Sequence, residues 1–184
     1  MSRVTKLYPD AAMKPTKLEV VAGWLELQPW FRGSVRQLRV VGNFRFEDPA
    51  GEVGMDSMLI ESRGDVYYIP VTYRPVPLPG WAESMGEMHH SVLGHRYCYN
   101  APTDPTFLTE LRRVIAEGDT HSEMQDMEGV PLPVTVRVEG NGVASDGKVR
   151  LIRRLGTYFP GDAKLIARWR LDGVEREDVL ATIH

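Results

Sequence analysis

The sequence lacks three features that mark extracellular, membrane-embedded or nucleic-acid-binding proteins. Its single cysteine, Cys98, cannot form a disulfide within the chain, which is typical of a reducing compartment. No apolar run is long enough to cross a bilayer, and the first seven residues are too polar for a signal peptide. The formal net charge of −3 gives no overall attraction to nucleic acids or anionic membranes. We therefore expect a cytoplasmic protein without a nucleic-acid or membrane partner.

Sequence motifs of several enzyme classes are also missing. The chain has neither a Walker phosphate-binding pattern nor a Gly-x-Ser-x-Gly nucleophile elbow. Gly140-Asn-Gly142 begins like a dinucleotide-binding fingerprint, but Ser145 stands where the third glycine belongs. A strand rather than a helix is expected next, so no helix N-terminus would meet a phosphate. These residues predict a turn, and we expect no cofactor.

The sequence contains two clear helix patterns. The first begins with Thr16 and Glu19, which have the spacing of a capping box, and it is stopped by Pro29. The second begins at Asp104-Pro105, a cap followed by a first-turn proline, and runs to about Ala116. Apolar residues recur at helical spacing in both segments, so each predicts an amphipathic helix.

Short alternating runs between and after these helices predict strands. The expected strands span residues 38–46, 52–61, 66–73, 87–93, 96–99, 132–139, 148–155, 164–171 and 179–183. Pro70 indicates an edge strand or a bulge, and the acidic stretch 117–128 lacks periodicity, which predicts a mobile loop. The expected fold class is α+β, with a mainly antiparallel, curved β-sheet and two principal α-helices packed on it. A hydrophobic fraction of 42% in 184 residues fits a single domain, residues 1–184.

Several short segments resemble the N-terminal cap of bacterial maltokinases. The resemblance begins with Pro15-Thr16-Lys17-Leu18-Glu19, Trp24-Leu25 and Gln28-Pro29-Trp30. It continues in Val41-Gly-Asn-Phe-Arg45, Tyr68-Ile-Pro-Val-Thr-Tyr-Arg74, His90-Ser-Val-Leu-Gly94 and Asp104-Pro105. In total it spans residues 7–111, and residues 129–184 are expected to form a β-rich C-terminal extension of the same domain.

What the resemblance implies is an accessory role rather than catalysis. Maltokinases phosphorylate maltose with ATP on the route from trehalose to α-glucan, and their cap is non-catalytic and sits on the N-lobe. The catalytic His-Gly-Asp loop and the Asp-Phe-Asp-like metal segment of those kinases have no counterpart here. The resemblance therefore implies a non-catalytic, cap-like interaction protein that is not an enzyme and is linked to trehalose and α-glucan metabolism.

Three classes of function remain open at this point. The first is contact with a partner, either a second copy of the chain or a kinase or other enzyme of α-glucan metabolism. The second is a small-ligand or carbohydrate-binding module with a pocket between the sheet and its helices, for which a sugar is the candidate ligand. The third is an enzyme of unrecognised type. A concave pocket with converging polar groups would favour the second class, and a flat apolar patch would favour the first.

Six residues are candidates for a ligand or partner surface. Four are the aromatic residues Trp24, Trp30, Tyr73 and Trp81, which could stack on a sugar, although a core role is expected for most of them. The other two, Arg168 and Arg170, share one face of an expected strand. That face is either a solvated surface or a patch for an anion or partner.

Histidine and cysteine residues are weak candidates for chemistry. His89, His90 and His95 lie close together in the sequence, but adjacent strand residues point to opposite faces, so we expect no metal site. The histidines are expected to bond to backbone and water. Cys98 lies in a strand-like run and is expected to be a small buried apolar side chain.

Overall fold

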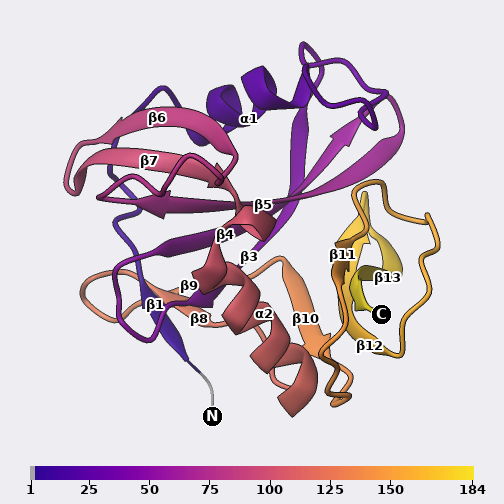
Figure 1. Ribbon diagram of the computed structural model, residues 1–184. Coiled ribbons are helices and arrows are strands. Elements are labelled where there is room, and N and C mark those ends of the chain that lie inside the picture. The colour runs from indigo at the N-terminus through magenta and orange to yellow at the C-terminus, as the bar shows by residue number, and fades with distance from the viewer. Residues whose placement is uncertain (1–2) are drawn as a thin grey trace.

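The computed structural model describes residues 3–184. Within them it contains two α-helices and three β-sheets arranged in layers (Figure 1). Met1 and Ser2, which belong to the expected domain 1–184 and to its polar N-terminus, lie outside the described residues. Over the same residues 3–184, no helix has the length and apolar character needed to cross a membrane. The expected α+β class with a mainly antiparallel, curved sheet is confirmed.

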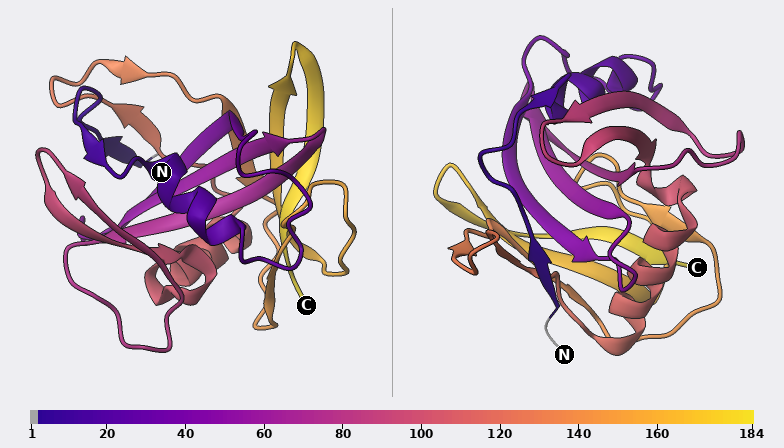
Figure 2. Two further views of the ribbon diagram at one scale, coloured as in Figure 1. Left: turned by 90° about the horizontal axis from the view of Figure 1, so that it is seen from above. Right: turned by 90° about the vertical axis from the view of Figure 1, so that its left-hand side faces the viewer.

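The largest sheet has six antiparallel strands in the order β2-β6-β7-β5-β4-β3. Its strands are β2 (Met13–Lys14), β3 (Arg39–Glu47), β4 (Gly54–Ser62), β5 (Asp65–Arg74), β6 (Ser84–His90) and β7 (Gly94–Asn100). The sheet is strongly curved, as the two views in Figure 2 show. Strands β3, β4 and β5 match the expected segments within about two residues, because their alternating pattern is long and regular.

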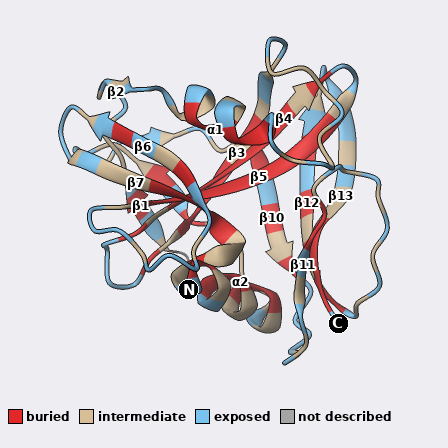
Figure 3. Ribbon diagram, turned by 45° about the horizontal axis from the view of Figure 1, so that its top comes forward, coloured by how far each residue is buried: buried red, intermediate tan, exposed pale blue. Residues whose placement is uncertain are grey.

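Both faces of this sheet are covered, so β4 and β5 are buried along nearly their whole length (Figure 3). Helix α1 (Lys17–Leu25) packs on one face, called the α1 face below, where its core includes Trp24, Ile60 and Ile69. Helix α2 (Pro105–Glu117) and a second sheet pack on the other face, where Leu59 and Tyr68 are buried. Because both faces are covered, β5 is apolar at most positions, and polar residues of β4 such as Asp56 and Ser57 are buried as well.

The second sheet has four antiparallel strands in the order β10-β12-β13-β11. They are β10 (Val136–Gly140), β11 (Val149–Leu151), β12 (Ala163–Leu171) and β13 (Val174–Ile183). From Ala163 to Trp169 the odd-numbered residues of β12 are buried and the even-numbered ones are more exposed, as the alternating sequence predicts. This sheet and α2 close the core on the side opposite α1.

A third, small sheet corrects one expectation. It consists of β1 (Val4–Lys6), β8 (Glu123–Gln125) and β9 (Pro131–Leu132), with β1 and β8 parallel. The stretch 117–128 is therefore not simply a mobile loop, since it contains β8. Ser122 is buried and donates hydrogen bonds to the carbonyl oxygen of Arg45 from its backbone N–H at 2.8 Å and its hydroxyl at 3.0 Å. A three-residue strand is too short to produce a periodic signal in the sequence.

The expected helix caps are confirmed. The Thr16 side chain accepts a hydrogen bond from the Glu19 backbone N–H at 3.2 Å, and Asp104 accepts one from the Thr106 N–H at 2.9 Å. Gly118 ends α2 with φ of 63°, a left-handed conformation that glycine adopts without strain.

Pro70 lies in the middle of the sheet, which corrects the expectation of an edge strand. β5 pairs with β7 over residues 71–74, while its first half pairs with the C-terminal segment, where the Tyr68 N–H donates to the Arg153 carbonyl at 2.9 Å. Pro70 stands between these two partners, at a place where a missing N–H interrupts neither ladder. Through these backbone hydrogen bonds, residues 153–155 of the C-terminal extension are joined to the first half of β5.

Candidate functional site

A cavity of about 470 Å³ lies on the α1 face of the six-stranded sheet, where β3 and β5 end near Glu47 and Tyr73 and β4 begins at Gly54. Its other walls are the N-terminal segment 5–9, the β6–β7 hairpin and residues of the small sheet. Figures 1 and 2 show that the β6–β7 hairpin and the small sheet of β1, β8 and β9 lie on the same side of the molecule. The volume falls within the range of small-molecule sites.

Three charged side chains and a tyrosine form the inner end of this cavity. Asp56 is buried and pairs with the Lys17 ammonium, Nζ to Oδ2, at 2.8 Å. Arg45 lies opposite Asp56 in the β3–β4 register, and its Nη1 is 3.6 Å from Asp56 Oδ1. The Lys17 ammonium also sits 5.3 Å from the centre of the Tyr73 ring. Lys17, Arg45 and Tyr73 line the cavity itself.

The charges and burial of this cluster shift the ionisation of two of its members. Burial alone would raise the pKa of Asp56, but attraction by Lys17 and Arg45 and the hydrogen bond from Lys17 outweigh it and lower the pKa. Burial, together with the nearby Asp56 carboxylate, raises the pKa of Tyr73 well above its usual value. At neutral pH Asp56 is therefore charged and Tyr73 keeps its proton.

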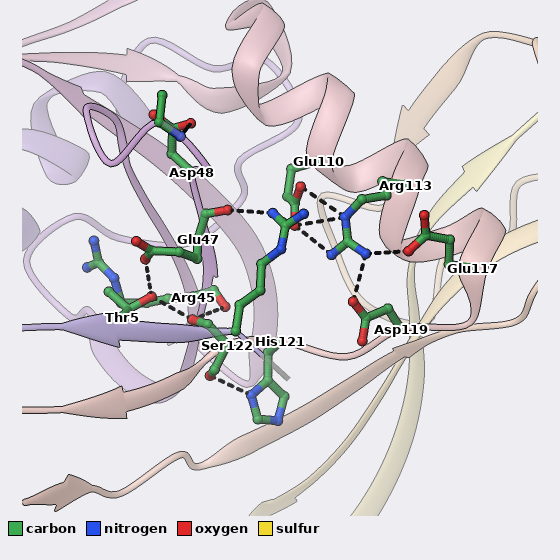
Figure 4. Close-up of polar contacts among 12 residues, drawn as sticks. Thr5, Arg45, Glu47, Asp48, Glu110, Arg113, Glu117, Asp119, His121 and Ser122 are labelled. Atoms are coloured by element: carbon green, nitrogen blue, oxygen red, sulfur yellow. Dashed lines mark hydrogen bonds and ion pairs between the residues drawn. The ribbon is translucent and has the colours of Figure 1, made fainter. Parts of the chain in front are cut away.

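Two hydrogen-bonding atoms of the cluster have no partner within residues 3–184. They are Nε of Arg45 and the hydroxyl of Tyr73, and the two residues are 7% and 8% exposed. Within residues 3–184, the one ion pair of the Arg45 side chain is the 3.6 Å contact with Asp56. The Arg45 guanidinium points away from the polar network around Glu110 and Arg113 (Figure 4). Buried donors without acceptors are uncommon in folded proteins and require an explanation.

The rim of the cavity carries charges of both signs. Lys6 and Arg96 line it together with Glu47 and Glu52. Lys6 donates to the Gln125 side chain at 2.9 Å, and Glu47 accepts the Thr5 hydroxyl at 2.5 Å. Glu47 is therefore already engaged with the protein. The rest of the lining is mainly apolar, including Leu7, Pro9, Met13, Val53, Met88 and Leu132.

The histidine residues lie on the β6–β7 hairpin. His90, at the cavity wall, accepts hydrogen bonds at Nδ1 from the backbone N–H groups of Val92 and Leu93, at 3.1 and 3.0 Å. Burial and the positive charge of Arg96 lower the pKa of His90, which agrees with a neutral, accepting ring. His89 and His95 are opposite each other in the register. No group of three or more metal-binding side chains converges in the part of the chain that the structure describes.

The aromatic candidates do not share one surface. Trp24 is 5% exposed and its ring centre is 5.7 Å from that of Trp30, on the α1 face of the sheet. Tyr73 lies in the cavity, and Trp81 is 61% exposed on the connection between β5 and β6. Trp24 and Tyr73 are thus core residues and Trp30 packs against them, which agrees with the core role expected for most of the four.

The arginine candidates lie on a different sheet. Arg168 and Arg170 share the exposed face of β12, as expected. Arg168 pairs with Glu177 at 2.9 Å and Arg170 with Glu175 at 2.6 Å, both across the β12–β13 hairpin. Opposite charges at neighbouring positions are typical of a solvated strand face.

Arg153 is a residue that nothing in the sequence distinguishes from the other arginines of the C-terminal strands. Its guanidinium lies 5.4 Å from the ring centre of Trp24 and 5.2 Å from that of Trp30, and it donates to the Asn100 side chain at 2.6 Å. Burial lowers its pKa to about 10. Glu83 joins the group by accepting from Trp24 Nε1 at 2.9 Å and from Asn100 at 2.7 Å. This cluster connects the C-terminal extension to α1.

A second polar network braces α2 (Figure 4). The Glu110 carboxylate forms ion pairs with the guanidinium groups of Arg3 at 2.8 Å and Arg113 at 2.7 Å. Arg113 also forms ion pairs with Glu117 and Asp119. Among the described residues, each charged side chain in this network has a partner of opposite charge, so the network ties the N-terminal segment to α2. Cys98 is buried, as expected, and burial raises the pKa of its thiol to about 12.

No curated protein matches the chain. A protein-family model matches residues 24–104, less than half of the 184 residues and within the segment 7–111 of the expected resemblance. The matched region runs from Trp24 in α1 through the six-stranded sheet to Asp104 at the start of α2. That family is the maltokinase N-terminal cap domain, and the match confirms the expected resemblance for this part of the chain.

Proposed function

We propose that this chain is a non-catalytic, maltokinase-cap-like accessory module that acts by binding another protein of trehalose or α-glucan metabolism. The observation that carries the proposal is the match of residues 24–104 to the maltokinase N-terminal cap domain. A cap that contacts a neighbouring protein body is the role that this relationship implies. A second copy of the chain or a kinase is the simplest partner.

The packing of the matched region supports a module that is stable by itself. α1 and the α1 face of the sheet enclose a core that includes Trp24, Leu25, Ile60, Tyr67 and Ile69. The sheet of the C-terminal extension and α2 together cover the opposite face. A buried surface on both faces means that the cap-like part does not need a kinase lobe to complete its core.

The ionisation of the buried carboxylates supports binding rather than catalysis. Burial would raise the pKa of Asp104, but hydrogen bonds from Arg74 and from the backbone of Thr106 outweigh it and lower the pKa. The pKa of Asp56 is lowered in the same way, by Lys17 and Arg45. A general acid or base works best with a pKa near the operating pH. The pKa values of these two carboxyl groups are instead shifted downward, away from neutral pH.

Two measurements test this proposal. Incubation of the purified protein with ATP, magnesium and maltose should yield no sugar phosphate above a heat-inactivated control, and activity that co-purifies with the protein would contradict it. Size-exclusion chromatography with light scattering, over a concentration series and with a maltose kinase or glucan-branching enzyme added, should reveal a defined complex. A strictly monomeric protein that binds none of these enzymes would overturn the accessory role.

A second candidate function is the binding of a small ligand, which the cavity favours. Polar side chains converge at its inner end, and apolar residues line the remainder, as in many ligand sites. The cavity lies against the sheet, and its other walls are the N-terminal segment, the β6–β7 hairpin and the small sheet, with Lys17 of α1 at its inner end. Calorimetric titration with maltose and short maltodextrins tests whether the ligand is a sugar.

A further inference from the structure

We propose that the cavity at Arg45, Lys17 and Tyr73 binds a small molecule through an oxyanion, either a phosphate ester or a carboxylate. The proposal rests on the second candidate function, small-ligand binding, and names the class of ligand. It does not depend on the protein-contact role. The observation that carries it is a buried guanidinium whose Nε has no acceptor, in the wall of the same cavity as a tyrosine hydroxyl that has no partner within residues 3–184.

The first step is the charge balance at the inner end of the cavity. Lys17 and Arg45 contribute two positive charges, and Asp56 contributes one negative charge. Asp56 is held closely by Lys17 at 2.8 Å, which leaves Arg45 with only the 3.6 Å contact. Moving a charge out of water is costly unless it is paired and hydrogen-bonded, so one further negative charge would complete this cluster.

The second step is the kind of hydrogen bonding that is left over. Nε of Arg45 can only donate, and the Tyr73 hydroxyl keeps its proton and can donate as well. Lys17 has three donors, of which Asp56 takes one, and about 30% of its side chain is exposed. A site with an excess of donors fits a ligand rich in acceptors. The planar guanidinium is suited to phosphate and carboxylate oxygens in particular.

The third step is access and selectivity. At the rim, Lys6 and Arg96 are balanced by the carboxylates of Glu47 and Glu52, and one Glu47 oxygen already accepts the Thr5 hydroxyl. The surplus positive charge therefore lies at the inner end, and the ligand is expected to present its anionic group inward and a neutral or polar body toward the rim. A neutral sugar would leave the extra positive charge of Arg45 uncompensated, which makes an anionic ligand the better fit.

The test compares anions with a neutral sugar by calorimetry and thermal unfolding. Inorganic phosphate, glycerol phosphate and acetate serve as probes, and maltose is the neutral comparison. Ionic strength is kept constant with chloride, because salt screens charges and phosphate also stabilises proteins by exclusion from their surface. The expected result is saturable binding of at least one of the anions, with a matching rise in the unfolding temperature.

Variants locate the site. Tyr73→Phe removes only the unpartnered hydroxyl, so the free protein should be as stable as the parent or more so, while anion affinity falls about tenfold. Arg45→Lys keeps the charge but loses the planar donor geometry, and Lys17→Gln removes one cation, so both should weaken binding. The matched controls are Tyr68→Phe, on the opposite face of β5, and Lys164→Gln on β12, which should bind anions like the parent.

Each result has a defined meaning. Saturable anion binding that is weakened by Tyr73→Phe and unchanged by Tyr68→Phe and Lys164→Gln supports the proposal. A response that does not saturate, or that is the same in all variants, is a general salt effect and overturns it. Binding of maltose with no anion binding also overturns the oxyanion assignment, while it leaves small-ligand binding and the accessory role standing.

Discussion

Arg74 and Asp104 are joined by two hydrogen bonds of 2.7 Å each, from Nε to Oδ2 and from Nη2 to Oδ1. Arg74 is the last residue of β5, and Asp104 is the N-cap of α2. The pair therefore fixes the start of α2 to the end of the central strand. Asp104 is fully buried, and Arg74 also donates to the Thr106 hydroxyl at 2.8 Å.

The first prediction concerns this pair. Asp104→Ala should lower the free energy of unfolding by about 3 to 5 kcal/mol, because it removes a helix cap and leaves the Arg74 guanidinium without its carboxylate. Asp104→Asn keeps a capping oxygen and should cost less. Urea denaturation at pH 7 measures both. Equal midpoints for Asp104→Ala and the parent would show that the pair does not stabilise the fold.

Much of this arrangement could be predicted from the sequence, because the signals are local. Asp104-Pro105 marks the start of α2 by residue type alone, and the alternation over residues 38–73 gives the central strands. The partner of Asp104 could not be predicted. Arg74 is 30 residues away, and nothing in its local pattern distinguishes it from any other arginine at a strand end.

The second prediction concerns the cap of α1. Thr16→Ala should lower the free energy of unfolding by about 1 kcal/mol, since the Glu19 N–H loses the hydroxyl that accepts its hydrogen bond. Thr16→Ser retains a hydroxyl and serves as the control. Chemical denaturation compares the three proteins, and a midpoint for Thr16→Ala that equals the parent's would mean that the hydroxyl contributes nothing.

The third prediction concerns Trp24. Trp24→Ala should lower the free energy of unfolding by about 3 kcal/mol, because a large buried ring is lost and Arg153 loses one of its two aromatic neighbours. Trp24→Phe keeps a ring but not the hydrogen bond to Glu83, so it should lie between the parent and Trp24→Ala. Denaturation followed by circular dichroism measures the effect. Near-native stability of Trp24→Ala would contradict the core role.

The candidate site was harder to predict than the fold, for a physical reason. Lys17, Arg45 and Tyr73 come from α1, β3 and β5, and each has an ordinary local role in the sequence pattern. Arg45 even occupies a position in an alternating strand that reads as solvent-facing. Only the β3–β4 register, which places Arg45 opposite Asp56, and the covering N-terminal segment make this position a buried one. Sequence spacing carries no information about such a cover.

The fourth prediction concerns the pH dependence of the Lys17–Asp56 pair. The folded-state pKa of Asp56 is lowered, so its ion pair stabilises the fold at pH values above the unfolded pKa of about 3.9 and loses this effect as the pH falls through the folded value. Asp56→Asn should therefore cost about 3 kcal/mol at pH 7, because Lys17 and Arg45 lose their carboxylate, and the difference from the parent should shrink below about pH 4.

Urea midpoints of the parent and Asp56→Asn at pH 7, 5, 4 and 3 measure this dependence. The control is Asp172→Asn, which breaks an exposed pair with Arg39 and should change the midpoint little at any of these pH values, since solvent and salt screen that pair. The mechanism requires the loss in Asp56→Asn to depend on pH. A loss of the same size at pH 3 and pH 7 would mean that the substitution acts through packing, and that the charge of Asp56 does not hold Lys17 and Arg45 at the cavity.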